Sequence, residues 1–182
     1  MNKKRVCGLF CVILMVSLIV STMVIVSLNS REDVRNLEIK NSGGTTGTAF
    51  VVFRSGVTSF NEDVVNQFVN GLIELDWCIA ITTASPQTAT NVTGYDLIVL
   101  AAPVNGGVPH QFMQDYLARA DFDGKPVVLI LTSGGESSTA AMNTFREETT
   151  SANGVVHTEL PFWIFDSTAL DSAFISGSEF SL

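Results

Sequence analysis

Five short runs of almost wholly apolar residues constrain the fold of this chain more than any other feature of its sequence. A strand that is buried on both faces has a continuous apolar run, whereas a half-exposed strand alternates apolar and polar residues. Segments with apolar residues at helical spacing separate the runs. This alternation predicts an α/β domain with a doubly wound, five-stranded parallel sheet that is covered by helices on both faces. The expected strands are residues 49–53, 77–81, 95–103, 125–133 and 155–160, and the expected helices are residues 61–75, 109–119, 137–150 and 166–176.

The chain begins with a segment of a different kind. Residues 1–5 form a basic N-terminus, and residues 6–28 contain no charged side chain. A helix needs about 20 residues to cross a bilayer core, so this run predicts an N-terminal transmembrane helix that anchors the chain. A cleaved signal peptide is the alternative, although the run has no convincing A-x-A cleavage site. Residues 29–47 are polar and rich in Gly, Ser and Thr, so we expect a flexible tether before a folded domain at residues 48–182.

Charge is distributed unevenly along the chain. Three cations precede the uncharged run and the charges just after it cancel, so the positive-inside rule predicts a single-pass membrane protein with a cytoplasmic N-terminus and the domain outside. Residues 48–182 carry four Lys and Arg against fifteen Asp and Glu, a net charge of −11. Such a domain lacks the cations that nucleic-acid phosphates require, so nucleic acid is excluded as a partner. Its acidic surface suits a partner protein with a basic docking face, or is simply a solvated surface that resists aggregation.

The cysteines and histidines indicate no metal site. The chain has three Cys and two His, and neither histidine has the spacing of a metal-binding motif. Cys78 lies inside an apolar run and is expected to be a small buried side chain. The chain also lacks the G-x-S-x-G motif of a hydrolase and any convincing catalytic triad.

Three of the expected strands end in turns that are rich in Gly, Ser or Thr. The carboxyl ends of parallel strands meet at one edge of a sheet, where ligands bind in doubly wound domains. Backbone N–H groups at a helix N-terminus and nearby hydroxyl groups bind a phosphate without a cation. Three such turns at one edge therefore predict a phosphate-binding site, although Gly and Ser are common in any turn. The turns are RSGVTS at residues 54–59, APVNGGVPH at residues 102–110 and TSGGESS at residues 132–138.

At these turns the chain resembles flavodoxin and its flavodoxin-like relatives, which bind flavin mononucleotide (FMN). The first turn of that family reads approximately T-G-x-T, and Ser55-Gly56-Val57-Thr58 is similar to it. The second family motif, Y-D-x-I-x-x-x-x-P-[IV]-[YW]-x-G, resembles YDLIVLAAPVNGG at residues 95–107. The third, G-K-x-V-x-x-x-x-T-x-G-G, resembles residues 124–135. The resemblance covers about residues 48–165 and implies a flavodoxin-like fold with FMN as cofactor.

The resemblance also implies which residues hold FMN. Hydroxyl and backbone N–H groups of the first turn would bind the phosphate, and the residues involved are Arg54, Ser55, Gly56, Val57, Thr58 and Ser59. The other two turns would flank the flavin ring, with Pro103, Val104, Asn105, Gly106 and Gly107 in one and Ser133, Gly134 and Gly135 in the other. No catalytic side chain is expected, because the flavin itself carries the chemistry.

The sequence departs from the family pattern at the two loops beside the flavin. Neither loop has an aromatic residue at the expected place, and Asn105 stands where one often stacks on the ring. Trp77 or Trp163 would replace it only if the fold carried one of them to this edge, and their places at the start of one strand and after the last favour packing in the core or on the surface. The interpretation is a membrane-tethered FMN protein that acts in electron transfer with a redox partner, or as a small flavin oxidoreductase. The alternative is a non-catalytic interaction module with the same fold that has lost flavin binding.

Overall fold

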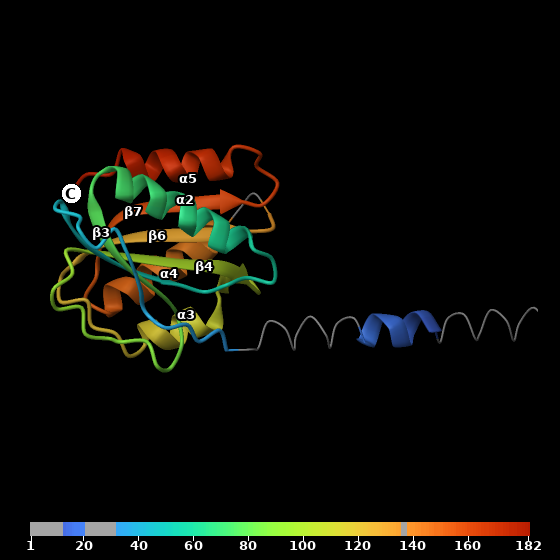
Figure 1. Ribbon diagram of the computed structural model, residues 1–182. Helices are drawn as coiled ribbons and strands as arrows, with labels where there is room; N and C mark the ends of the chain where they lie inside the picture. Colours follow the sequence, from blue (N-terminus) through green and yellow to red (C-terminus); the bar gives the residue numbers. More distant parts are fainter. Residues whose placement is uncertain (1–12, 21–31, 136–137) are drawn as a thin grey trace, which may run out of the picture. The chain divides into compact units, whose positions relative to one another are not determined.

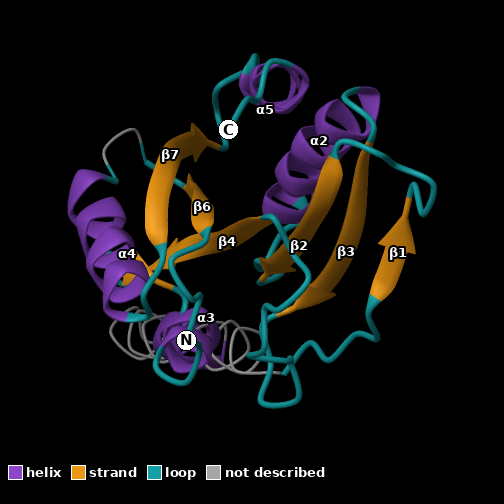
Figure 2. Cartoon of the chain, turned by 90° about the vertical axis from the view of Figure 1, so that its left-hand side faces the viewer, coloured by secondary structure: helices purple, strands orange, loops and turns teal. Residues whose placement is uncertain are grey.

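The computed structural model describes residues 13–20, 32–135 and 138–182. The chain divides into two units, residues 1–32 and residues 33–182. The second unit is the α/β domain, in which helices cover a twisted sheet (Figures 1 and 2). In the described part of the chain the sheet has seven strands, which are β1 (Glu38–Lys40), β2 (Gly47–Phe53), β3 (Trp77–Thr83), β4 (Leu97–Asn105), β5 (Val108–Pro109), β6 (Pro126–Ser133) and β7 (Val155–Trp163).

The centre of the sheet is parallel, as the apolar runs predicted. Five strands run parallel in the order β3-β2-β4-β6-β7. From β2 the chain continues to β3 on one side of it and then crosses to β4 on its other side. The sheet therefore has a topological switch point between β2 and β4, which is the usual place for a ligand in an open α/β sheet.

The prediction of a purely parallel, five-stranded sheet is wrong, because two short strands make the sheet mixed. β1 pairs antiparallel with β3 at one edge, and β5 pairs antiparallel with β4. The turn before β5 contains Gly106 and Gly107, with φ of 63° and 86°. Glycine adopts this left-handed region without strain, and a two-residue hairpin turn requires it. β1 has only three residues, so it covers the edge of β3 without presenting a long free edge itself.

Helices cover both faces of the sheet, with α2 (Phe60–Glu74) and α5 (Ala169–Ser178) on one face and α3 (Gln111–Leu117) and α4 (Thr139–Ser151) on the other (Figures 1 and 2). Alternate side chains of each central strand enter two separate cores. In β2, Val51 packs in the core that contains Phe68 of α2, whereas Phe50 packs in the core that contains Phe145 of α4. Burial on both faces explains why the central strands are continuous apolar runs.

The prediction of a transmembrane helix at residues 6–28 is wrong for the described part of the chain, and so is the single-pass membrane protein inferred from it. Residues 13–20 form a helix, and no helix in the ranges that the structure describes is long and apolar enough to cross a membrane. Residues 6–12 and 21–28 of the predicted span lie outside the described residues.

Much of the expected tether at residues 29–47 lies on the α/β unit. Glu38–Lys40 form β1, and the Asn41 side-chain amide donates to the Trp77 carbonyl oxygen at 3.0 Å. A polar segment can form an edge strand because its outward side chains remain in water, as the exposed Glu38 does. Residues 29–31 lie outside the described residues.

Candidate functional site

The first predicted turn connects the carboxyl end of β2 to α2, and hydrogen bonds hold its backbone on two sides. The Arg54 N–H donates to the Ala101 carbonyl oxygen of β4 at 2.9 Å. The Arg54 carbonyl oxygen accepts from Asn61 Nδ2 at 2.6 Å, and Asn61 Oδ1 accepts from the Thr132 hydroxyl of β6 at 2.9 Å. Asn61 is only 2% exposed. A buried amide therefore connects the start of this turn to the end of β6.

Arg54 is a buried cation at the start of the turn. It is 4% exposed, and its guanidinium carbon lies 4.7 Å from the centroid of the Phe112 ring. The Phe112 ring in turn stacks on His110, with the ring centroids 5.6 Å apart. Burial lowers the pKa of Arg54 from its ordinary value, and the charge of Asp33 acts in the opposite direction. Arginine remains protonated in proteins, so the turn has a fixed positive charge at its base.

The rest of the turn is more open. Ser55 and Gly56 are half-buried, whereas Val57, Thr58 and Ser59 are exposed. Ser59 precedes α2, and its side chain makes no capping hydrogen bond to the helix. A Cβ on Gly56 would lie 3.3 Å from the Thr58 carbonyl oxygen and 3.8 Å from Pro103. The turn therefore combines exposed hydroxyl groups with a backbone that passes close to the second turn.

The second predicted turn is a tight hairpin. Val104 pairs with Pro109 and Asn105 pairs with Val108 across it. Pro103 lies in register with Thr132 of β6 and close to Gly56, so it stays beside the first turn. Asn105, Gly106 and Gly107 are exposed at the hairpin tip, and a Cβ on either glycine would meet nothing within 4 Å. The structure thus brings Pro103 to the candidate site and leaves the hairpin tip in solvent.

The third predicted turn lies against an aromatic pair. The Ser133 hydroxyl donates to the Gly135 carbonyl oxygen, and the Trp163 indole N–H donates to the Gly134 carbonyl oxygen at 3.2 Å. The Trp163 ring meets Phe165 edge to face with centroids 5.7 Å apart, and Phe165 is 73% exposed. A hollow of about 510 Å³ is lined by Ser133, Trp163 and Phe165 among others. The fold therefore carries an aromatic side chain to a loop that lacks one in the sequence.

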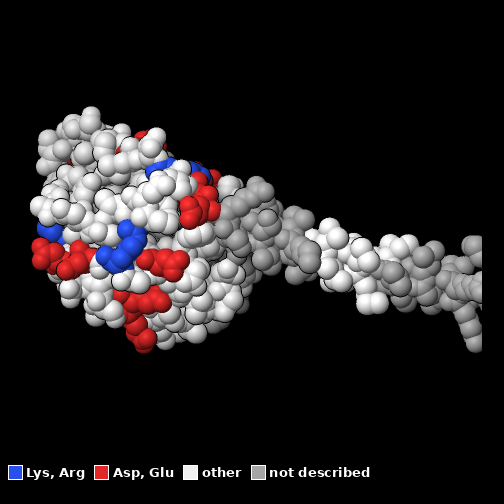
Figure 3. Space-filling model, turned by 90° about the horizontal axis from the view of Figure 1, so that it is seen from below, with Lys and Arg blue, Asp and Glu red and all other residues white. Residues whose placement is uncertain are grey.

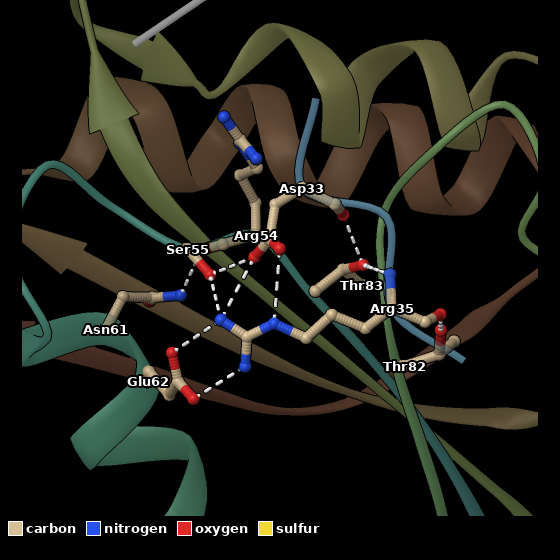
Figure 4. A network of polar contacts seen from close by, with 8 residues as sticks. All are labelled: Asp33, Arg35, Arg54, Ser55, Asn61, Glu62, Thr82 and Thr83. Carbon is tan, nitrogen blue, oxygen red and sulfur yellow. Dashed lines mark hydrogen bonds and ion pairs between the residues drawn. The ribbon is translucent and has the colours of Figure 1, made fainter. Parts of the chain in front are cut away.

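A segment near the N-terminus contacts the first turn and the first turn of α2 (Figure 4). The Ser55 hydroxyl donates to the Asp33 carboxylate at 2.5 Å and accepts from Arg35 Nη2 at 3.2 Å. The Arg35 guanidinium donates to both carboxylate oxygens of Glu62, at 2.7 and 3.0 Å, and to Asp33 at 3.2 Å. Two carboxylates, one guanidinium and one hydroxyl group therefore form a continuous network over the turn.

The backbone of the same segment is bonded to the end of β3. The Thr83 hydroxyl donates to the Asp33 carbonyl oxygen and accepts from the Arg35 N–H at 3.1 Å. The Thr82 hydroxyl donates to the Arg35 carbonyl oxygen at 2.9 Å. Thr83 is fully buried, whereas the side chains of Asp33 and Arg35 are 25% and 43% exposed. We refer to residues 33–35 as the N-terminal strap.

Asp33 has a stabilised negative charge at this position. Burial by itself would raise the pKa of Asp33, but hydrogen bonds from Ser55 and Arg35 and the charges of Arg35 and Arg54 outweigh it, and the pKa lies below its ordinary value of 3.8. Asp33 is therefore ionised at neutral pH. Ser55 and Arg54 of the first turn and Arg35 of the strap together stabilise this charge.

Sequence reasoning missed several residues of this edge. Asn61 lies three and four residues before Val64 and Val65, so helical spacing alone places it on the buried face of α2. A polar residue on such a face indicates a specific hydrogen bond. Asp33 and Arg35 had no comparable signal, because their segment has no apolar periodicity.

The two tryptophans lie in different places. Trp77 begins β3 and packs edge to face with Phe180, with ring centroids 6.1 Å apart, in the core beneath α2 and α5. Trp163 ends β7, and because β6 and β7 run parallel it lies beside the end of β6. Of the two, Trp163 is therefore the one at the edge of the candidate site.

The arrangement defines a flavodoxin-like α/β fold, with five parallel strands and three turns at their carboxyl ends. Similar solved structures include a flavodoxin from Streptococcus pneumoniae, at 17% identity and a TM-score of 0.59, covering 72% of this chain and 96% of that chain. Oxidised flavodoxin 1 from Bacillus cereus is 14% identical with a TM-score of 0.61, covering 74% and 99%. The NAD(P)H:quinone oxidoreductase from Methanothermobacter marburgensis is 11% identical with a TM-score of 0.59, covering 75% and 100%.

No protein-family model matches the chain, and no curated protein sequence matches it. The similarity to solved structures confirms the flavodoxin-like fold that the three motifs predicted. Within the part of the chain that the structure describes, no group of three or more His, Cys, Asp and Glu residues could hold a metal ion. The edge combines exposed hydroxyl groups, a buried cation and an exposed aromatic side chain.

Proposed function

We propose that the chain is an FMN-binding protein that acts in electron transfer or as a small flavin oxidoreductase. The observation that carries this proposal is the first turn, in which the exposed hydroxyl groups of Thr58 and Ser59 follow the buried cation of Arg54. This is the position at which the resemblance to flavodoxins expects the FMN phosphate. The fold supports the proposal, because the turn lies at the switch point between β2 and β4.

The first turn would bind the phosphate through several weak donors rather than one strong cation. Ser55 and Thr58 would donate hydroxyl hydrogen bonds, and Ser59 is a further donor. The backbone N–H groups of Gly56 and Val57 would point at the same oxygens, as they do where a loop enters a helix. Arg54 would add a positive charge at the base of the turn.

The flavin ring would lie between the other two loops. Pro103 and Ser133 are at the ends of β4 and β6, and Trp163 would add aromatic surface beside Gly134. When bound, FMN supplies the redox chemistry, whereas the chain binds it, orients it and excludes water from it. The proposal assigns the other residues of these two loops to the surroundings of the flavin ring as well, namely Val104, Asn105, Gly106, Gly107 and Gly135.

A redox partner with a basic docking face is part of this proposal. On the face shown in Figure 3, acidic side chains lie around the few basic ones. A hollow of about 560 Å³ is lined by residues of α3 and α4 that include Asp115, Glu147 and Glu148, and none of its lining residues is Lys or Arg. Opposite charges accelerate the encounter of two proteins and are screened by salt. Electron transfer to such a partner should therefore slow as the ionic strength rises.

Titration with two flavins tests the phosphate-binding turn. Riboflavin lacks the phosphate, so the wild-type protein should bind FMN more tightly than riboflavin. A hydrogen bond to a charged group contributes about 1.5–3 kcal/mol, so Thr58→Ala should weaken FMN binding about 10- to 150-fold and leave riboflavin binding unchanged. Gly56→Val should weaken FMN binding further, because its side chain would crowd the turn at the Thr58 carbonyl oxygen.

Flavin fluorescence quenching measures both affinities, and Thr93→Ala is the matched control. Thr93 is exposed and lies just before β4, at the amino ends of the parallel strands and away from the candidate site. Loss of its hydroxyl group should therefore change neither affinity. If the wild-type protein binds FMN and riboflavin equally well, the turn does not serve the phosphate.

A second function is a non-catalytic interaction module with the same fold. Two observations favour it, since Asp33 already engages the Ser55 hydroxyl and the β4–β5 hairpin carries no aromatic side chain. In this case neither flavin binds, and the purified protein contains no yellow chromophore. Absence of flavin binding from the wild-type protein and from Asp33→Asn would refute the first function and favour the second.

A further inference from the structure

The N-terminal strap makes the hydrogen bonds that a phosphate would need at Ser55. A serine hydroxyl has one proton to donate, and Ser55 donates it to the Asp33 carboxylate. Its oxygen accepts at the same time from Arg35. A phosphate that entered the turn would therefore find the Ser55 hydroxyl already engaged. It would also lie beside the Asp33 carboxylate, and two neighbouring negative charges repel each other.

The contacts of the strap are mainly polar: residues 33–35 form hydrogen bonds with Ser55, Glu62, Thr82 and Thr83, and the Arg35 guanidinium carbon lies 5.3 Å from the centroid of the Phe53 ring. The side chains of the strap are partly exposed, and Val34 between Asp33 and Arg35 is 44% exposed. Asp33 is also the first residue of the α/β unit. Segments at the end of a unit that are held by polar contacts rather than by apolar burial open at a fraction of the global free energy of unfolding. The strap can therefore leave the turn without disturbing either core.

We propose that the strap is an autoinhibitory element, in which the Asp33 carboxylate occupies the position of the FMN phosphate and must leave before FMN binds. This inference rests on the proposed function. It describes two states, one with the strap docked on Ser55 and one with the strap released. FMN binds only the released state, so the apparent affinity is reduced by the fraction of molecules in that state.

Removal of the Asp33 charge in the full chain tests the competition. Asp33→Asn keeps the shape of the side chain, and it should tighten FMN binding at least about tenfold, because one hydrogen bond to a charged group corresponds to about 10- to 150-fold in affinity. Riboflavin binding should not change. Asp123→Asn is the matched control, because Asp123 is exposed in the turn before β6, at the opposite edge of the sheet. Asparagine also tolerates the positive φ of 51° at that position.

A second variant releases the strap without changing any charge. The Thr83 hydroxyl bonds to the strap backbone on both sides of Val34, so Thr83→Val should loosen the strap and also tighten FMN binding. Hydrogen exchange of a peptide that covers residues 33–37 reports the strap directly. Its exchange should be faster in Thr83→Val than in the wild-type protein, and FMN should accelerate it in the wild-type protein.

The outcomes separate this inference from the proposed function. If wild type and Asp33→Asn bind FMN equally and FMN leaves the exchange of residues 33–37 unchanged, the strap inference fails while FMN binding stands. Tighter binding by Asp33→Asn without any gain in Thr83→Val would show a simple effect of charge and would also overturn the strap. If no variant binds FMN, both inferences fail.

Discussion

Asn61 is the residue whose loss should most directly loosen the candidate site. Its buried side chain bonds the Arg54 carbonyl oxygen at 2.6 Å and the Thr132 hydroxyl at 2.9 Å. Asn61→Ala leaves both groups without this partner, and each such buried group costs about 1–3 kcal/mol. The better helix propensity of alanine returns about 0.5 kcal/mol. We expect Asn61→Ala to lower the free energy of unfolding by about 2–4 kcal/mol, because water can reach part of the opened site.

A double-mutant cycle isolates the bond between the two side chains. Thr132→Val removes the hydroxyl and should cost about 1–2 kcal/mol, because Asn61 Oδ1 loses its donor. The double variant should be about 1 kcal/mol more stable than the sum of the single effects predicts, since the same bond is lost only once. Asn70→Ala is the control, because Asn70 is exposed on the same helix, and it should change the free energy of unfolding by less than about 0.5 kcal/mol.

Urea denaturation followed by circular dichroism measures these free energies, and two results would contradict the reasoning. One is a cost of less than about 0.5 kcal/mol for Asn61→Ala, which would mean that the two buried groups find other partners. The other is strict additivity of Asn61→Ala and Thr132→Val, which would mean that the two side chains are not coupled in solution.

Two further predictions concern helices outside the turn. A Cβ on Gly177 would lie 2.1 Å from the Phe68 carbonyl oxygen of α2, so Gly177→Ala should lower the free energy of unfolding by about 1–3 kcal/mol. Gly43→Ala is the control, because a Cβ on Gly43 would meet nothing within 4 Å, and it should leave the free energy of unfolding unchanged in the same urea titration. If Gly177→Ala is as stable as the wild-type protein, α2 and α5 do not pack this closely. Burial raises the pKa of Glu148 above its ordinary value of 4.5, and its buried Oε2 has no hydrogen-bond partner among the described residues. The resulting loss of stability is absent below the ordinary pKa and complete above the raised one. Glu148→Gln should therefore raise Tm at neutral pH and leave it unchanged at about pH 4 in calorimetry, and an equal effect at both pH values would contradict the burial argument.

The sequence by itself determined the parallel core of the sheet and the edge at which the candidate site lies. β4 is apolar through Leu97–Ala102 because water is excluded from both of its faces, and that exclusion is recorded in the residues of the strand itself. The same holds for the buried face of α2, where Val64, Val65 and Phe68 follow helical spacing. The turns at Ser55, Pro103 and Ser133 fall at one edge because parallel strands all end on the same side.

Only the tertiary structure decided which groups surround the candidate turn. Asp33 bonds to Ser55 across 22 residues of sequence, and Trp163 bonds to Gly134 across 29. Neither contact follows from the pattern of its own segment, because partly exposed polar groups are not required to alternate with apolar ones. Their pairing depends on where the rest of the chain carries them. β1 is a similar case, since its short polar segment becomes a strand only where the edge of β3 offers unpaired N–H and C=O groups.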